Sequence, residues 1–142
     1  MLAAAMCVGF VVADAIQVVE LSRLEGEWRV VSALGAEGRN GATVTIHWGE
    51  ILYRMPFPVV RLGTVIRLVP GTEPKQMDVR RESETVPGQA PDDTRLAIYE
   101  LRGDTLRLSI NRPGVRRPMA FPDGNTVPDH GAEWFVLERL KK

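Results

Sequence analysis

LEGEWRVV, at residues 24–31, is the stretch that decides the fold of this chain. It contains a Gly-x-Trp motif, and from Trp28 onward the period is two, with Trp28, Val30, Ser32 and Leu34 alternating with Arg29, Val31 and Ala33. That period is typical of a β-strand with one buried face. The lead-in at residues 16–25 has apolar residues spaced for one face of a helix, namely Val18, Val19, Leu21 and Leu24. We therefore expect a short helix or turn that leads into a β-domain.

The strand pattern recurs along the rest of the chain, and turn signals separate its segments. Asn40-Gly41, Gly49-Glu50 and Arg102-Gly103-Asp104 favour turns, because glycine supplies a positive φ at such positions. Residues 111–132 form one long connection without periodicity. The predicted strands cover residues 28–34, 43–48, 51–55, 64–69, 76–81, 95–101, 105–110 and 133–140. Short strands joined by turns predict an antiparallel barrel or sandwich.

The composition limits the class of protein. The 142 residues leave room for one domain with one core. The 18 basic and 18 acidic residues cancel, and the aromatic residues are not interleaved with the arginines, so we expect no nucleic-acid binding. The single cysteine, Cys7, excludes an intrachain disulfide and a cysteine-rich zinc site.

The first residues, MLAAAMCVGFVVADA, predict an export signal. An apolar run from Leu2 to Val12 precedes Ala13-Asp14-Ala15, a small-x-small site suited to a signal peptidase. The run is too short for a stable membrane span. We therefore predict a signal peptide at residues 1–15, a domain at residues 16–142, and a periplasmic, envelope or extracellular location. Two alternatives remain open, a membrane-retained signal and an apolar helix packed on the domain.

The Gly-x-Trp motif followed by antiparallel strands resembles the first strand of lipocalins. Nearly all of residues 16–142 resembles an uncharacterised family of small lipocalin-like secreted domains that is abundant in planctomycete bacteria. The resemblance implies export and an all-β fold, an eight-stranded antiparallel lipocalin-like barrel with a short N-terminal helix or turn. It implies no activity, and Ser109 lies near a position where the family often has a cysteine. The matching stretches, which agree in order and spacing, are Leu24–Trp28 with Val30-Val31, Leu68–Pro70, Pro74–Asp78, Ile98–Leu101, Gly103–Leu106, Arg117-Pro118 with Phe121, and Leu137–Arg139.

The resemblance also implies a closure device at one end of the barrel. In lipocalins a basic residue of the last strand commonly covers the tryptophan of the first strand. Trp28 and Arg139 are the corresponding pair here, and their cation–π contact would be worth about 0.5–2 kcal/mol. Gly26 would let the lead-in approach this pair. We expect the role of all three residues to be structural.

No arrangement of residues in the sequence predicts catalysis. His47 and His130 do not form a metal-ligand pair such as His-x-His, and no serine lies in a Gly-x-Ser-x-Gly elbow. Glu50, Asp78 and Glu100 would suit glycoside chemistry, but each also fits the outward position of an alternating strand. We expect no enzyme activity, no metal and no cofactor.

Two features could form contacts at the barrel mouth. Phe57, between Pro56 and Pro58, could line a pocket entrance or fold back onto the core. Arg112, Arg116 and Arg117 lie in the long connection, where they could bind an anion or remain solvated.

Two functions follow from the predicted barrel, and the sequence leaves the oligomeric state open. An eight-stranded barrel is just wide enough to be filled by side chains or to hold one small ligand. The first hypothesis is a binding module for a small apolar or amphipathic molecule. The second is a structural or protein-interaction module of the cell envelope with a solidly packed barrel. The side chains that distinguish them are Trp28, Trp48, Tyr53, Tyr99, Trp134 and Phe135, since a majority pointing inward would leave no room for a ligand.

Overall fold

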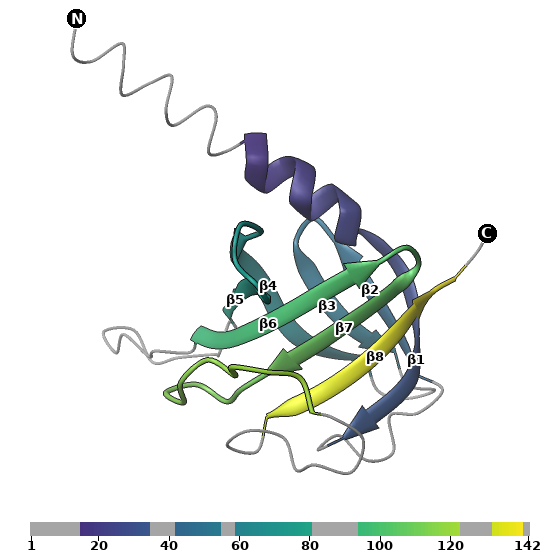
Figure 1. Cartoon of the computed structure of the whole chain (residues 1–142). Helices are drawn as coiled ribbons and strands as arrows, with labels where there is room; N and C mark the ends of the chain where they lie inside the picture. Colours follow the sequence, from purple (N-terminus) through teal and green to yellow (C-terminus); the bar gives the residue numbers. More distant parts are fainter. Residues whose placement is uncertain (1–14, 35–41, 55–58, 81–93, 123–131, 141–142) are drawn as a thin grey trace, which may run out of the picture.

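Each strand of the barrel pairs with the next along the chain, and the last strand returns to pair with the first (Figure 1). The computed structural model describes residues 15–34, 42–54, 59–80, 94–122 and 132–140. All pairings are antiparallel, so the predicted all-β, eight-stranded antiparallel barrel is confirmed. The strands are β1 (Gly26–Leu34), β2 (Thr43–His47), β3 (Glu50–Arg54), β4 (Val59–Val69), β5 (Lys75–Arg80), β6 (Thr94–Arg102), β7 (Thr105–Ile110) and β8 (Glu133–Arg139).

The predicted lead-in is helical over residues 15–24 and lies at one end of the barrel (Figure 1). The same end carries the β2–β3, β4–β5 and β6–β7 turns, because strands that alternate in direction return to it after every second crossing. Gly103 has a φ of 57° in the β6–β7 turn, so Arg102-Gly103-Asp104 is a hairpin turn as predicted. We call this end the helix end.

The barrel interior contains aliphatic side chains and four large aromatic ones. Trp28, Tyr53, Tyr99 and Phe135 are each at most 1% exposed and belong to one core cluster. The rings of Tyr53 and Phe135 lie with centroids 5.2 Å apart. The alternation seen in the sequence is therefore the alternation of inward and outward side chains in the barrel.

Arg139 and Trp28 make the contact that the sequence analysis expected. The guanidinium carbon of Arg139 lies 4.2 Å from the centroid of the Trp28 ring. The Trp28 indole donates to the carbonyl of Leu24 at 3.0 Å, and Arg139 donates to the carbonyls of Glu25 and Arg23 at 2.8 and 2.7 Å. A Cβ added at Gly26, whose φ is 137°, would lie 2.9 Å from Arg139 Nη1. The positive φ favours glycine at this position, and a larger residue would also displace the guanidinium.

The prediction was wrong for Trp48, which was placed on the apolar face of the second strand. The side chain is 80% exposed, because β2 ends at His47 and Trp48 begins a two-residue turn with Gly49. Trp134 is only half-buried, so four of the six distinguishing aromatic side chains lie in the core.

The predicted apolar face of the helix meets the barrel only in part. Leu24 is fully buried and Leu21 packs on the core, but Val18 and Val19 are exposed. Gln17 and Glu20 contact the barrel instead, because their side chains form hydrogen bonds there with the Leu68 backbone and the Tyr99 hydroxyl.

Two strands also differ from their predicted form. β4 begins at Val59 rather than at Thr64, and a register shift between Ile51 and Leu52 interrupts its pairing with β3. A second shift, between Val30 and Ser32, breaks the alternation predicted for β1. Such bulges shift side chains between the two faces, which hides a strand from a search for strict alternation.

Some predictions fall outside the described residues. They concern the signal peptide up to Asp14, Asn40-Gly41, Phe57 and His130. The described helix is too short to cross a membrane.

Replacing Trp28 by alanine should lower the free energy of unfolding by roughly 3–5 kcal/mol, because it removes a buried aromatic side chain and the ring on which Arg139 packs. Urea denaturation would measure the change. The control is Trp48→Phe, which should stay within about 0.5 kcal/mol of the parent since the ring is exposed. Equal stability of the Trp28 variant and the parent would contradict the closure role.

Gly63 in β4 offers a test of the backbone at the β3–β4 bulge. Its φ is 147°, and an added Cβ would lie 2.7 Å from both the Arg80 carbonyl oxygen and Val79 Cγ1. Gly63→Ala should therefore cost at least about 2 kcal/mol, since strain and overpacking each cost about 1–3 kcal/mol. Gly71→Ala is the matched control, because its added Cβ meets no atom within 4 Å. Similar melting temperatures for the two variants would refute this account.

Candidate functional site

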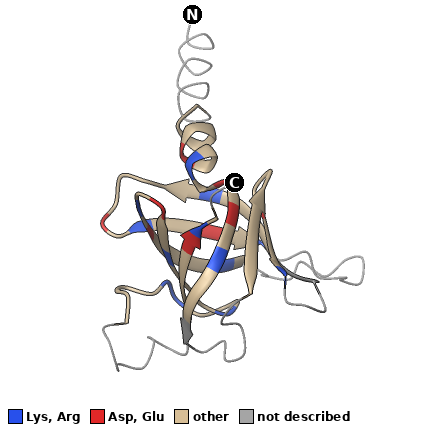
Figure 2. Cartoon of the chain, turned by 90° about the vertical axis from the view of Figure 1, so that its right-hand side faces the viewer, with Lys and Arg blue, Asp and Glu red and all other residues tan. Residues whose placement is uncertain are grey.

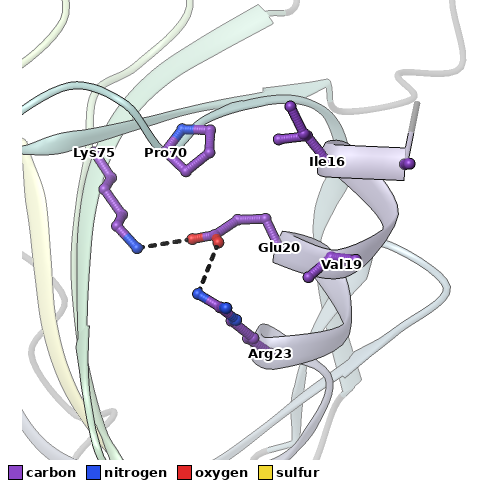
Figure 3. A pocket seen from close by; sticks show the side chains of 7 residues that line it. Ile16, Val19, Glu20, Arg23, Pro70 and Lys75 are labelled. Atoms are coloured by element: carbon purple, nitrogen blue, oxygen red, sulfur yellow. Dashed lines mark hydrogen bonds and ion pairs between the residues drawn. The ribbon is translucent and has the colours of Figure 1, made fainter. Parts of the chain in front are cut away.

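Glu20 is the centre of a buried polar cluster at the helix end. The residue is 4% exposed, and its Oε1 accepts hydrogen bonds from the Tyr99 hydroxyl at 2.7 Å and from Lys75 Nζ at 3.0 Å. Arg23 Nη1 lies 3.6 Å from its other carboxylate oxygen. Figure 3 shows the side chain of Glu20 directed between Lys75 and Arg23. Tyr99 reaches this cluster from inside the barrel, so the cluster joins the helix to the core.

The charges of the cluster are mutually stabilising. Burial by itself raises the pKa of the Glu20 carboxyl, but hydrogen bonds from Tyr99 and Lys75 and the charges of Lys75 and Arg23 outweigh it and hold the pKa below its usual 4.5. Burial, with the hydrogen bond to Glu20 and its charge, raises the pKa of the Tyr99 hydroxyl. Glu20 therefore stays ionised and Tyr99 stays protonated at neutral pH. This arrangement satisfies the buried carboxylate.

Gln17 fixes the other end of the described helix. Its amide oxygen accepts from the backbone N–H of Leu68 at 2.8 Å, and its amide nitrogen donates to the Leu68 carbonyl. The side chain thus pairs with β4 as a neighbouring strand would. Together Gln17 and Glu20 determine which face of the helix meets the barrel.

A groove of about 500 Å³ lies between the helix and the β4–β5 turn (Figure 3). Ile16, Val19 and Pro70 make most of its wall apolar, while Glu20 and Lys75 lie at its inner side. The groove is open to solvent and lies outside the barrel core. It could accept an apolar group next to a charged one.

A second polar cluster, at the opposite end of the barrel, was missed in the sequence. Arg95 is 7% exposed, donates to the carbonyl of Asn111 at 2.9 Å, and lies 3.5 Å from a Glu133 carboxylate oxygen. The alternation of β6 could have revealed this cluster, because Arg95 lies on the same inward side of the strand as Ala97 and Tyr99. A charged residue at an inward position of a strand requires a buried partner.

The three arginines of the long connection, for which the sequence left anion binding and solvation both open, have different surroundings. Arg112 and Arg116 are exposed. The Arg117 guanidinium instead lies against the outside of β5 and β6, where it pairs with Asp78 and donates to the carbonyls of Met77 and Ala97 at 3.1 and 2.8 Å. Arg117 thus attaches the connection to the barrel wall, a role that its position in a loop did not indicate.

The remaining chemical candidates lie on the barrel surface. Glu100 forms ion pairs with Arg102 and Arg107, at 3.2 and 2.9 Å. His47 is exposed and makes an edge contact with the Trp48 ring, with centroids 5.5 Å apart. Among the described residues, no group of three or more His, Cys, Asp or Glu side chains could hold a metal ion.

We compared the chain with known protein families, curated proteins and solved structures. No protein-family model, curated protein or solved structure matches the chain. The resemblance to planctomycete lipocalin-like domains therefore stays a prediction.

Glu20→Gln should lower the stability by about 1–3 kcal/mol at pH 7, because it weakens two charge-assisted hydrogen bonds. The pKa of Glu20 is lowered in the folded chain, so its contribution is complete above pH 4.5 and is lost as the pH falls through the lower folded value. The difference in melting temperature between parent and variant should therefore shrink below pH 4.5.

Glu138→Gln is the matched control for that measurement. Its ion pair with Arg29 has a similar distance, 3.0 Å, but both side chains are more than half exposed. Its loss should change stability little at any pH. A Glu20 variant that behaves like the Glu138 variant would contradict the buried cluster.

Proposed function

We propose that this chain is a non-catalytic, exported β-barrel with a filled interior that acts as a structural or interaction module of the cell envelope. The observation that carries the proposal is the position of the aromatic side chains. Trp28, Tyr53, Tyr99 and Phe135 are all inside the core cluster. These are four of the six side chains whose inward orientation would leave no space for a ligand.

The polar groups at the two ends of the barrel support the same proposal. At the helix end, the Tyr99 hydroxyl is held by Glu20, so the tyrosine ring stays in place. Near the other end, Arg95 is held between Asn111 and Glu133. Moving either side chain to admit a ligand would leave a buried polar group without its partner, which costs about 1–3 kcal/mol. The hypothesis of a ligand inside the barrel therefore receives no support from these side chains.

An apolar probe distinguishes a filled barrel from a hollow one. Saturating benzene should leave the melting temperature of the parent unchanged, whereas Met77→Ala should open a cavity in which benzene binds and raises the melting temperature. Met77 is 1% exposed and belongs to the core cluster. If the cavity left by Met77→Ala collapses, Phe135→Ala serves as a second variant, because it removes a larger side-chain volume.

The groove beside the helix needs its own control in this experiment. Val19→Ser makes the groove more polar without changing the core. A saturable stabilisation of the parent by benzene that persists in Val19→Ser would contradict the proposal, since the ligand would then lie in the barrel.

A further inference from the structure

The helix at residues 15–24 presents its apolar residues to the outside. Gln17 and Glu20 face the barrel, while Ile16, Val18 and Val19 are 49%, 66% and 53% exposed. A helix that packs only on its own barrel would normally bury these three aliphatic side chains. The inversion leaves an apolar surface that nothing in the described chain covers.

Trp48 adds a second apolar group that local structure does not favour. The Trp48-Gly49 turn has positive φ at both positions, 53° and 80°, which defines a type I′ hairpin turn. Asn, Asp or Gly normally occupies the first position, because a bulky side chain is strained there. Here that position holds a tryptophan that is 80% exposed. The turn carries an aromatic ring into solvent at a cost in backbone energy.

The turn and the helix lie at the same end of the barrel. A Cβ added at Gly49 would lie 3.8 Å from Leu21 Cδ2 on the helix. Val65 in β4 donates to the Gly49 carbonyl at 2.8 Å, and the next residue, Ile66, is also half exposed. We call Ile16, Val18, Val19, Trp48 and Ile66 the apical patch.

Two polar groups on the helix part of the apical patch already have partners within the protein. The Ser22 hydroxyl donates to the Val19 carbonyl at 2.6 Å, and Arg23 faces Glu20. The one acidic side chain among helix residues 15–24 is turned inward, and most of the helix carries neither sign of charge (Figure 2). A protein partner would need about one hydrogen bond per 100–200 Å² of interface, and this helix face offers few free groups. An apolar medium needs none.

The chain before residue 15 joins the helix at this same end. Its apolar run Leu2–Val12 belongs to the predicted export signal, which would be removed after residue 15. Tryptophan is enriched at the boundary between lipid and water, and β-branched aliphatic residues partition into the layer beneath it.

We propose that the apical patch seats the helix end of the barrel on the surface of a lipid bilayer. Trp48 and the outer helix face enter the boundary between headgroups and acyl chains, while the barrel stays in water. The inference rests on the proposed function and names the partner of that module. The contact is apolar, so neutral lipid is sufficient for it.

Vesicle flotation of residues 16–142, which lack the predicted signal peptide, tests whether the apical patch binds lipid. The parent should float with phosphatidylcholine vesicles, and brominated phosphatidylcholine should quench part of its tryptophan fluorescence, because Trp48 reaches the acyl chains. Trp48→Asn should weaken partitioning by about tenfold and remove most of the quenching, since burying one large aromatic side chain contributes about that much. Its melting temperature should hold or rise, because asparagine suits a type I′ turn. A separate double variant, Val18→Ser with Val19→Ser, should weaken flotation similarly.

Met119→Asn is the matched control. Met119 is 73% exposed and lies in the connection after β7, away from the helix end, so its replacement should leave flotation unchanged. Flotation that both patch variants retain in full would overturn the inference, since other parts of the protein would then bind the vesicles. Binding only to anionic vesicles, reversed by salt, would also overturn it. So would a dimer in lipid-free buffer that Trp48→Asn dissociates, because the patch would then bind a second copy.

The two proposals fail separately. Benzene binding inside the parent barrel contradicts the filled interior and leaves flotation untouched. Absence of flotation, with an interior that excludes benzene, removes the bilayer seat and leaves the filled barrel in place.

Discussion

The contact between Arg139 and Trp28 holds together the parts of the chain that are farthest apart in sequence. One guanidinium stacks on the indole of β1 and donates to the carbonyls of Arg23 and Glu25 where the helix ends. It also lies 3.4 Å from the Asp104 carboxylate in the β6–β7 turn. Carbonyls at the C-terminal end of a helix lack partners within the helix, so a cation from the last strand is well suited to them. Barrel closure and helix placement therefore depend on the same side chain.

The orientation of the helix shows that specific polar partners can outweigh an amphipathic pattern. Burying Val18 and Val19 would have been favourable by about 25 cal/mol per Å² of apolar surface. The barrel end instead offers the Leu68 backbone, the Tyr99 hydroxyl and the Lys75 ammonium, and leaving these groups without partners would be costly. Gln17 and Glu20 satisfy them, so the aliphatic side chains turn outward. The apical patch is thus a consequence of how the barrel end is sealed.

The strands were predictable because alternation is local information, whereas the clusters were not. Leu106, Leu108 and Ile110 display their inward face in the sequence itself, and the structure buries all three. Arg117 could not be placed in this way, because its partner Asp78 lies 39 residues away on another strand. Trp48 was misplaced for a related reason. The pattern of β2 continues through it, and only the pairing of His47 with Glu50 shows that the turn has begun.

The sequence by itself determined an all-β domain preceded by a short helix or turn, the approximate course of its strands, and the Gly26-x-Trp28 start. Each of these follows from neighbouring residues, since side-chain alternation and turn chemistry act over a few positions. Only the tertiary structure decided that four aromatic side chains of the described residues lie in the barrel core, that Glu20 is buried, and that Val18, Val19 and Trp48 face outward. Those outcomes depend on which strands lie beside each other once the barrel has closed, and on which polar groups closure leaves in need of partners.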